Sequence, residues 1–240
     1  MYNRDYLTDG KSEEQVHSNY EQKTETRQQD LVGFLRATYQ LFASSLLAAT
    51  VGAYIGLGMA SVISTWYWGL FILELVLLFA LYAVKDKPRI NLAVLFAFTF
   101  MTGLTLTPLL SGVFNMPGGA SIVAQAFLMT SVAFGGISLF ALTTKRDFSF
   151  MGKFLMITLI IMIVGVFANI FFFQSPLLQL GISMVGAVLF SAFILYDTQQ
   201  IIKGGFSTPI EAAIALYLDF LNLFISLLHI LAAFAGNKDD

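Results

Sequence analysis

Long apolar runs, separated by short polar or Gly/Pro-containing breaks, dominate the chain after residue 30. Seven of these runs are long enough for a helix that crosses a bilayer, which takes about 20 apolar residues. We expect the spans at 33–58, 66–84, 91–112, 121–142, 151–173, 178–202 and 209–235. The runs are continuously apolar rather than alternating, which argues against membrane-spanning strands. The pattern therefore predicts an all-α, polytopic membrane protein with seven transmembrane helices.

The composition supports a membrane protein and excludes several other classes. Of the 240 residues 57% are hydrophobic and 12% are charged, whereas a soluble domain is about 25% charged. A net charge of −2 argues against a nucleic-acid partner, and the absence of cysteine excludes disulfides and thiolate metal sites. Membrane lipid is the expected surrounding, and nothing in the composition indicates a bound cofactor.

The first 30 residues differ from the rest of the chain. They carry 11 of the 28 charges and are rich in Gln, Glu, Asp, Thr and Ser. Because the N-terminus is polar, we do not expect it to be a cleavable signal peptide. We expect residues 1–30 to be a mostly disordered tail and residues 31–240 to form the seven-helix transmembrane domain.

The basic residues orient the predicted spans. Seven spans place the two termini on opposite sides of the membrane. Counted from Lys23 onwards, the N-terminal side then carries ten Lys and Arg residues and the other side only Lys238. Loops rich in Lys and Arg stay in the cytoplasm. We therefore expect a cytoplasmic N-terminus and a C-terminus on the opposite side.

A few ionisable residues fall inside the predicted spans, where a charge costs about 2.5–3.5 kcal/mol or more. They are Glu74, Asp197, Glu211, Asp219 and His229. Because of that cost, each is a candidate functional residue.

The last span carries a polar stripe. At about 100° per residue, Glu211, Asp219, Asn222, Ser226 and His229 lie within an arc of about 80°. Such a stripe faces protein or water rather than lipid. Asn222 and Ser226 also fit interhelical hydrogen bonding, His229 the far interface, and Glu211 a helix N-terminal acid.

Asp197 lies near the cytoplasmic end of span six and Asp219 roughly 15 Å into span seven. Adjacent antiparallel helices can bring the two carboxyl groups together. Such a pair would share a proton near neutral pH and would favour a hard cation such as Ca²⁺. The alternative is that Asp197 only reaches out to the cytoplasmic interface.

Spans two and three carry three further candidates. Glu74 lies amid apolar residues and is expected to be protonated or paired with a polar group of another span. Gly103 allows close helix packing, and Pro108 should kink span three and expose backbone carbonyls. Ordinary helix packing explains this stretch equally well.

Four stretches of the sequence resemble the Bax inhibitor-1 family in its bacterial form. They are Thr102-Gly103-Leu104-Thr105-Leu106-Thr107-Pro108, Thr144-Lys145-Arg146-Asp147-Phe148-Ser149, Leu195-Tyr196-Asp197-Thr198-Gln199 and Leu216-Tyr217-Leu218-Asp219-Phe220-Leu221-Asn222-Leu223-Phe224. The resemblance extends over about 33–235. It implies six helices around a central seventh.

The resemblance also implies roles for individual residues. Asp197 and Asp219 match an aspartate pair that acts as a pH-sensitive latch and cation site in a Ca²⁺ leak pathway, and Glu74 matches an acid of span two. In some bacterial relatives an arginine after span two reaches the aspartate pair. The corresponding stretch here contains Lys85 and Arg89, either of which is a candidate for that part.

Three functions compete. The first is a passive, pH-sensitive Ca²⁺ leak across the bacterial inner membrane. The second is an intramembrane aspartyl protease, disfavoured because Ala215-Leu216-Tyr217-Leu218-Asp219 lacks the Gly-x-Gly-Asp of such enzymes; we therefore expect no catalytic residue. The third, suggested by some bacterial relatives, is a regulator of a membrane-anchored AAA protease. Residues 1–30 would be a docking segment in that case, or otherwise an inert tail.

Overall fold

The computed structural model describes residues 13–236, which fold into helices joined by short turns. The elements are α1 (Glu13–Gly58), α2 (Ala60–Val84), α3 (Ile90–Thr105), α4 (Thr107–Phe114), α5 (Gly119–Thr143), η1 (Ser149–Met151), α6 (Gly152–Ala168), η2 (Asn169–Phe173), α7 (Pro176–Lys203) and α8 (Pro209–Gly236). Seven stretches are long and apolar enough to cross a membrane, and within residues 13–236 there is no strand. The all-α, seven-span prediction is confirmed.

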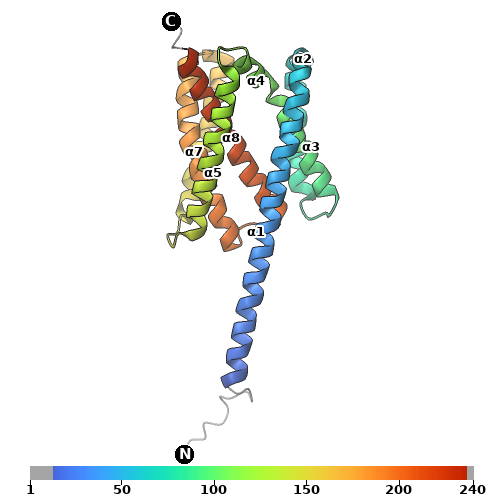
Figure 1. The fold of residues 1–240 in the computed structure, drawn as a ribbon, viewed down its shortest axis with the longest axis vertical. Coiled ribbons are helices and arrows are strands. Elements are labelled where there is room, and N and C mark those ends of the chain that lie inside the picture. The colour runs from blue at the N-terminus through green and yellow to red at the C-terminus, as the bar shows by residue number, and fades with distance from the viewer. Residues whose placement is uncertain (1–12, 237–240) are drawn as a thin grey trace, which may run out of the picture.

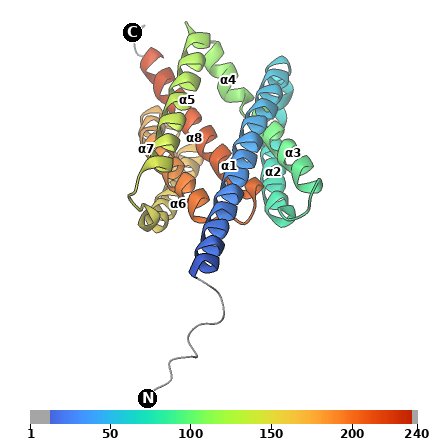
Figure 2. The ribbon, with the colours of Figure 1, turned by 60° about the horizontal axis from the view of Figure 1, so that its bottom comes forward.

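The last span, α8, lies in the centre of the bundle. Figure 2 shows α1 crossing in front of α8, with α5, α6 and α7 on one side and α2 and α3 on the other. In the most hydrophobic 18-residue stretch of α8, 50% of the residues are buried within the protein, whereas in that of α2 only 6% are. α8 packs mainly on α7, α5 and α1. The central position expected for the seventh span is confirmed.

The first helix differs from the sequence prediction. α1 begins at Glu13, so residues 13–30, expected to be disordered, continue the first span as one helix that projects beyond the bundle (Figure 1). The segment is polar but rich in Glu, Gln, Lys and Arg, which are good helix formers. Residues 1–12 lie outside the described residues.

Local sequence signals define the ends of the last two spans. Ser175 caps α7 by accepting a hydrogen bond from the Leu178 N–H, and Pro176 occupies the first turn. Gly204 ends α7 with a φ of 73°, a conformation that glycine adopts without strain. Pro209 then begins α8 after a short turn. α7 and α8 are therefore adjacent antiparallel helices.

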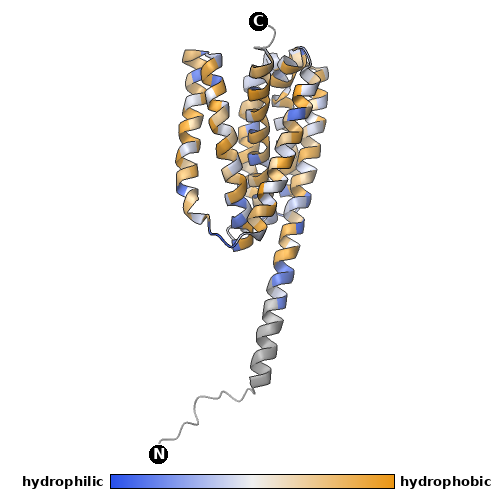
Figure 3. Cartoon of the chain, turned by 60° about the vertical axis from the view of Figure 1, so that its left-hand side comes forward, coloured by the Kyte–Doolittle hydropathy of each residue, from blue (hydrophilic) through white to orange (hydrophobic). Residues whose placement is uncertain are grey.

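The two ends of the bundle differ in charge. Lys85, Lys87, Arg89 and the Lys145-Arg146 pair lie in loops at the end where α8 begins, and we call this the basic end. Figure 3 shows hydrophobic residues over most of the bundle and hydrophilic residues gathered towards this end. We call the other end, where α8 finishes, the opposite end.

The third span is divided into α3 and α4. α3 ends at Thr105, and α4 starts at Thr107 with Pro108 in its first turn. The Thr102 carbonyl still accepts from the Leu106 N–H, 3.0 Å away. Proline lacks an N–H and disfavours the helical conformation of the preceding residue, which explains an interruption at this point.

An aromatic cluster holds α8 against two neighbouring helices. The rings of Phe42 on α1 and Phe134 on α5 stack with their centroids 4.6 Å apart. The ring of Phe220 on α8 meets both edge-on, at 5.7 and 5.6 Å. All three side chains are buried. The cluster fixes the rotation of α8 and turns the face that carries Asp219 away from α1 and α5.

The crossing of α1 and α3 depends on Gly103. A Cβ atom built there would overlap the backbone of Ala49 and Ala53 on α1. Gly103 therefore lets the two helix backbones touch, as small residues do in membrane helix pairs.

We expect Gly103→Leu to destabilise the fold by about 1–3 kcal/mol or more, because backbone atoms cannot move aside as a flexible side chain can. The measurement is thermal unfolding in detergent. Gly136→Ala on α5 is the control, since nothing lies within 4 Å of a Cβ there. Equal stability of the two variants would contradict the close crossing.

Candidate functional site

Asp197 of α7 and Asp219 of α8 meet at the boundary between the two helices. Their carboxyl groups lie close enough to interact with each other. Asp219 is 5% exposed and Asp197 is half-buried. The Oδ2 atom of Asp219 has no hydrogen-bond partner among the described residues. The pair therefore presents an unused oxygen, and two carboxyl groups this close remain together most readily when they share a proton.

Tyr217 links this region of α8 to α3. Its side chain is fully buried, and its hydroxyl forms a short hydrogen bond with the hydroxyl of Thr102. The Tyr217 ring also meets the edge of Phe98 on α3, with centroids 6.1 Å apart. These contacts hold the helical turn before Asp219 against α3, the part of span three that begins at the basic end.

A cavity of about 530 Å³ occupies the half of the bundle towards the opposite end. Side chains from α2, α3, α4, α6, η2, α7 and α8 form its wall. Its polar lining consists of Tyr67, Glu74, Thr102, Thr105, Gln179, Ser183, Asn222, Ser226 and His229. Neither Asp197 nor Asp219 lines it. The rest of the lining is apolar, so the cavity is a chamber that carries polar groups among apolar ones and stops short of the aspartate pair.

Three side chains close the chamber on the side of the aspartates. Thr102 on α3, Phe190 on α7 and Leu218 on α8 are the lining residues of their helices closest to the basic end. Leu218 immediately precedes Asp219, so Asp219 lies beside this end of the chamber, whereas Asp197, seven residues after Phe190 on α7, lies nearer the basic end. We call these three residues the floor of the cavity.

The polar stripe of the last span divides between two places. Asn222, Ser226 and His229 line the cavity, whereas Glu211 lies at the basic end. The Asn222 amide donates to the Leu218 carbonyl (2.7 Å), and His229 Nδ1 lies 3.0 Å from the Ile225 carbonyl. Both contacts are within α8, so the outer parts of these side chains remain available to the chamber.

Glu74 enters the same chamber from α2. Its carboxyl group accepts a hydrogen bond from the Thr105 hydroxyl at 2.5 Å. Pro108, at the start of α4, also lines the chamber. The break in span three therefore borders the cavity, as broken helices in membranes often do.

The two basic candidates after span two lie in different settings. Lys85 Nζ forms an ion pair with Glu211 Oε1 at 3.0 Å, at the start of α8. Glu211 also accepts from the N–H and hydroxyl of Ser207. Arg89 is exposed, with a φ of 72°, and both residues line a surface hollow beside α1. Lys85 is therefore the basic residue that reaches the inner helix.

Sequence reasoning did not single out Tyr217, Gln179 or Ser183 as site residues. Tyr217 lies two residues before Asp219 and could have been found as a polar group on the same helix. Gln179 and Ser183 lie on the α7 stretch that faces α8, but the assignment of their face needs the packing of both helices.

Comparisons with known proteins agree with this architecture. The family model "Inhibitor of apoptosis-promoting Bax1" matches residues 31–236. The chain belongs to the Bax inhibitor-1 family. The match includes every site residue described above and begins after the polar segment 1–30.

Several bacterial members of the Bax inhibitor-1 family are similar to the chain. An uncharacterized protein of Campylobacter jejuni is 51% identical, covering 98% of both chains. One of Helicobacter pylori is 46% identical over 90% of this chain and 93% of its own. The modulator of FtsH protease YccA of Escherichia coli is 38% identical over 65% of this chain and 69% of its own. The same sequence match in another Escherichia coli strain is described as an inner membrane protein. This Bax inhibitor-1 family member is accordingly a multi-pass inner-membrane protein.

Because the chain has no cysteine, single cysteines can report whether the chamber holds water. We expect Asn222→Cys to react with a charged methanethiosulfonate reagent, because the reactive thiolate needs water. Ile161→Cys on α6, at a position 65% exposed on the apolar outer surface, should remain unlabelled. Labelling is read by mass spectrometry of protein in liposomes. An unreactive Asn222→Cys would mean that the stripe serves only in packing.

Proposed function

We propose that this Bax inhibitor-1 family member is a passive, pH-sensitive cation leak across the inner membrane, and that Ca²⁺ is the cation. The observation that carries the proposal is the close approach of Asp197 and Asp219 beside the end of a chamber that carries polar groups. A pathway of this kind has water-accessible polar groups on one side of a carboxylate site and a charged exit on the other.

The pair suits a passing cation better than a resident one. Hard cations such as Ca²⁺ take six to eight oxygen ligands, and two carboxylates supply only part of that number. Among residues 13–236, no group of three or more His, Cys, Asp or Glu side chains is placed to hold a metal. Weak, incomplete coordination is what transport requires, because the ion has to leave again.

The same pair supplies the proton switch. With one shared proton the site carries a single negative charge, and loss of that proton doubles the charge and strengthens cation binding. Glu74 in the chamber and the Lys85–Glu211 ion pair at the basic end would be the next charged groups on either side.

We place the basic end in the cytoplasm, because Lys and Arg gather in its loops. A cation would then enter the chamber from the opposite side and meet the aspartates before the cytoplasm. Nothing in this pathway breaks a covalent bond, and the sequence before Asp219 lacks the glycine motif of intramembrane aspartyl proteases. We therefore favour a non-enzymatic function.

We expect Asp219→Asn to abolish the pH dependence of Ca²⁺ flux into proteoliposomes, because an amide cannot share or release the proton. The measurement is fluorescence of an entrapped Ca²⁺ indicator at several pH values across the neutral range. Asp86→Asn, in the exposed loop after α2, is the control and should retain the wild-type profile. A variant Asp219→Asn with wild-type flux and pH response would overturn the proposal.

A second function, compatible with the first, is modulation of a membrane-anchored protease. It rests on the similarity to the Escherichia coli protein whose name states that it modulates FtsH. The α1 segment of residues 13–30 projects beyond the basic end and is outside the family match, so it offers a surface for such a partner.

We expect the full chain, but not a variant lacking residues 1–30, to co-purify with the host's membrane-anchored AAA protease. Quantitative mass spectrometry after mild detergent extraction measures the partner. The full chain and the shortened variant should unfold at the same temperature, because the helix bundle is retained in both. Equal recovery of the protease with both would show that the segment is not the docking surface.

A further inference from the structure

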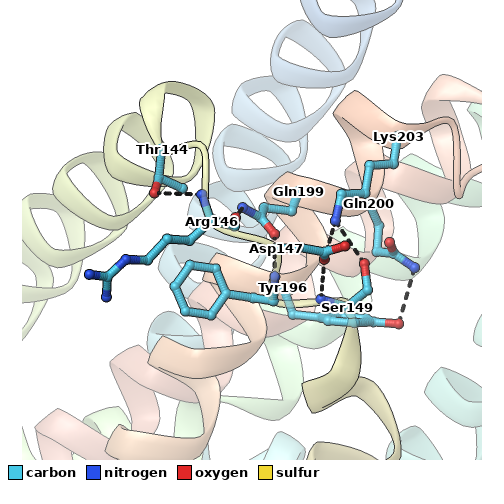
Figure 4. Close-up of polar contacts among 9 residues, drawn as sticks. Thr144, Arg146, Asp147, Ser149, Tyr196, Gln199, Gln200 and Lys203 are labelled. Carbon is cyan, nitrogen blue, oxygen red and sulfur yellow. Dashed lines mark hydrogen bonds and ion pairs between the residues drawn. The ribbon is translucent and has the colours of Figure 1, made fainter.

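The loop between α5 and α6 folds back onto the end of α7 that bears Asp197 (Figure 4). This loop contains the stretch Thr144–Ser149, which resembles the family but has no part in the leak pathway as proposed. Its contacts with α7 connect residues more than 50 positions apart in the sequence. We call this set of contacts, formed by Gln199 and Lys203 of α7 with the loop, the brace.

Gln199 makes the central contacts of the brace. Its Oε1 atom accepts from the Phe148 N–H at 2.9 Å, and its Nε2 atom donates to the Arg146 carbonyl at 2.7 Å. The side chain is 5% exposed. Only a side-chain amide of this length both donates and accepts in this way, so the two bonds fix the loop against one point of α7.

An ion pair holds the rim of the brace. Lys203 Nζ binds the Asp147 carboxylate and the Ser149 hydroxyl, the latter at 2.8 Å. Asp147 also accepts from the Ser149 N–H at 2.7 Å. The Arg146 side chain points away from these groups, so this residue contributes only its backbone (Figure 4).

The ion pair persists at neutral pH. The hydrogen bond from Lys203, followed by those from Ser149, lowers the pKa of Asp147 from 3.8 to about 2. A lowered pKa in the folded state means that the contribution is complete above the ordinary value and is lost only as the pH falls towards about 2. The brace is therefore constant over the range in which the leak is proposed to respond.

The brace lies behind Asp197. Gln199 follows Asp197 by two residues, which places it about 200° around the helix. Next to it, the Thr198 hydroxyl lies 3.5 Å from that of Ser138 on α5. Tyr196 packs on Gly152 of α6 so closely that a Cβ there would lie 2.5 Å from its hydroxyl. The end of α7 is thus supported from the loop, α5 and α6, while Asp197 faces α8.

We propose that Gln199 is a positioning residue that holds α7 against the loop and thereby sets the separation of Asp197 from Asp219. The inference rests on the proposed cation leak. It adds to that proposal a residue whose hydrogen bonds go to the loop and not to either aspartate. With the brace intact, the two carboxylates present a fixed pair of oxygens to a cation. Without the brace, the end of α7 can move away from α8. The two carboxylates then no longer hold their oxygens in a fixed position for a cation.

The test is Ca²⁺ flux in liposomes, measured against Ca²⁺ concentration at one fixed pH. Gln199→Met keeps the length of the side chain and removes both hydrogen bonds. We expect it to raise the half-saturating Ca²⁺ concentration several-fold, up to about 10-fold, as loss of outer supports of a cation site does. Maximal flux should change less, whereas a general loss of folded protein would lower the maximum alone.

Two matched controls share the same surroundings. Gln200→Met changes the next residue, whose amide bonds only the Tyr196 hydroxyl among the described side chains. Arg146→Gln removes a charge from the loop but leaves its carbonyl in place. Both variants should retain the wild-type half-saturating Ca²⁺ concentration. The double variant Asp147→Lys with Lys203→Asp, which exchanges the two charges, should retain it as well. The single substitution Lys203→Asp should resemble Gln199→Met.

The outcomes separate the two proposals. Absence of Ca²⁺ flux in the wild type would overturn the leak itself. If the wild type conducts Ca²⁺ and Gln199→Met has the same half-saturating Ca²⁺ concentration, the proposed role of Gln199 is wrong, whereas the proposed leak is unaffected. If Gln199→Met fails to fold, the exposed Lys203→Asp variant and its rescue by Asp147→Lys decide the question instead.

Discussion

A carboxyl group at membrane depth has to be enclosed by protein, and this requirement determines the position of α8. Exposure of Asp219 to lipid would cost several kcal/mol, more than a marginally stable fold can spare. Its helix therefore lies in the middle, and α1, α5 and α7 pack around it. The Phe42, Phe134 and Phe220 cluster fixes the apolar side of α8, which directs its polar stripe towards α2, α3 and α7.

The enclosed aspartate pair has unlike surroundings on its two sides. Towards the opposite end it borders the chamber, whose lining residues nearest the basic end are Thr102, Phe190 and Leu218. Towards the basic end lie two ion pairs, Lys85 with Glu211 and Lys203 with Asp147. In a leak of the proposed kind, protonation changes the charge at the pair but leaves the floor in place. A cation would lose part of its hydration to pass between Phe190 and Leu218, which is costly unless the neighbouring carboxylates are charged.

The sequence determined the spans and the aspartate pair because both depend on local patterns. Apolar runs of sufficient length mark helices, and a short turn between α7 and α8 makes them antiparallel neighbours. Other features depend on geometry that no local pattern contains. Lys85 and Arg89 are four residues apart, and only the path of the turn after α2 decides which one reaches Glu211. Residues 13–30 are polar enough for a disordered tail, yet their helix-forming composition lets α1 extend through them.

Long-range contacts also explain why the four stretches that resemble the family occur together. Thr102 of the first stretch bonds Tyr217 of the fourth, and Asp219 of the fourth meets Asp197 of the third. Gln199, at the end of the third, binds the backbone of the second. A buried amide or hydroxyl that loses its partner costs about 1–3 kcal/mol, so each of these bonds is stable only when both stretches are in place. Four segments that are separate in the sequence are thus held to one another by polar contacts on α7 and α8, on either side of the aspartate pair.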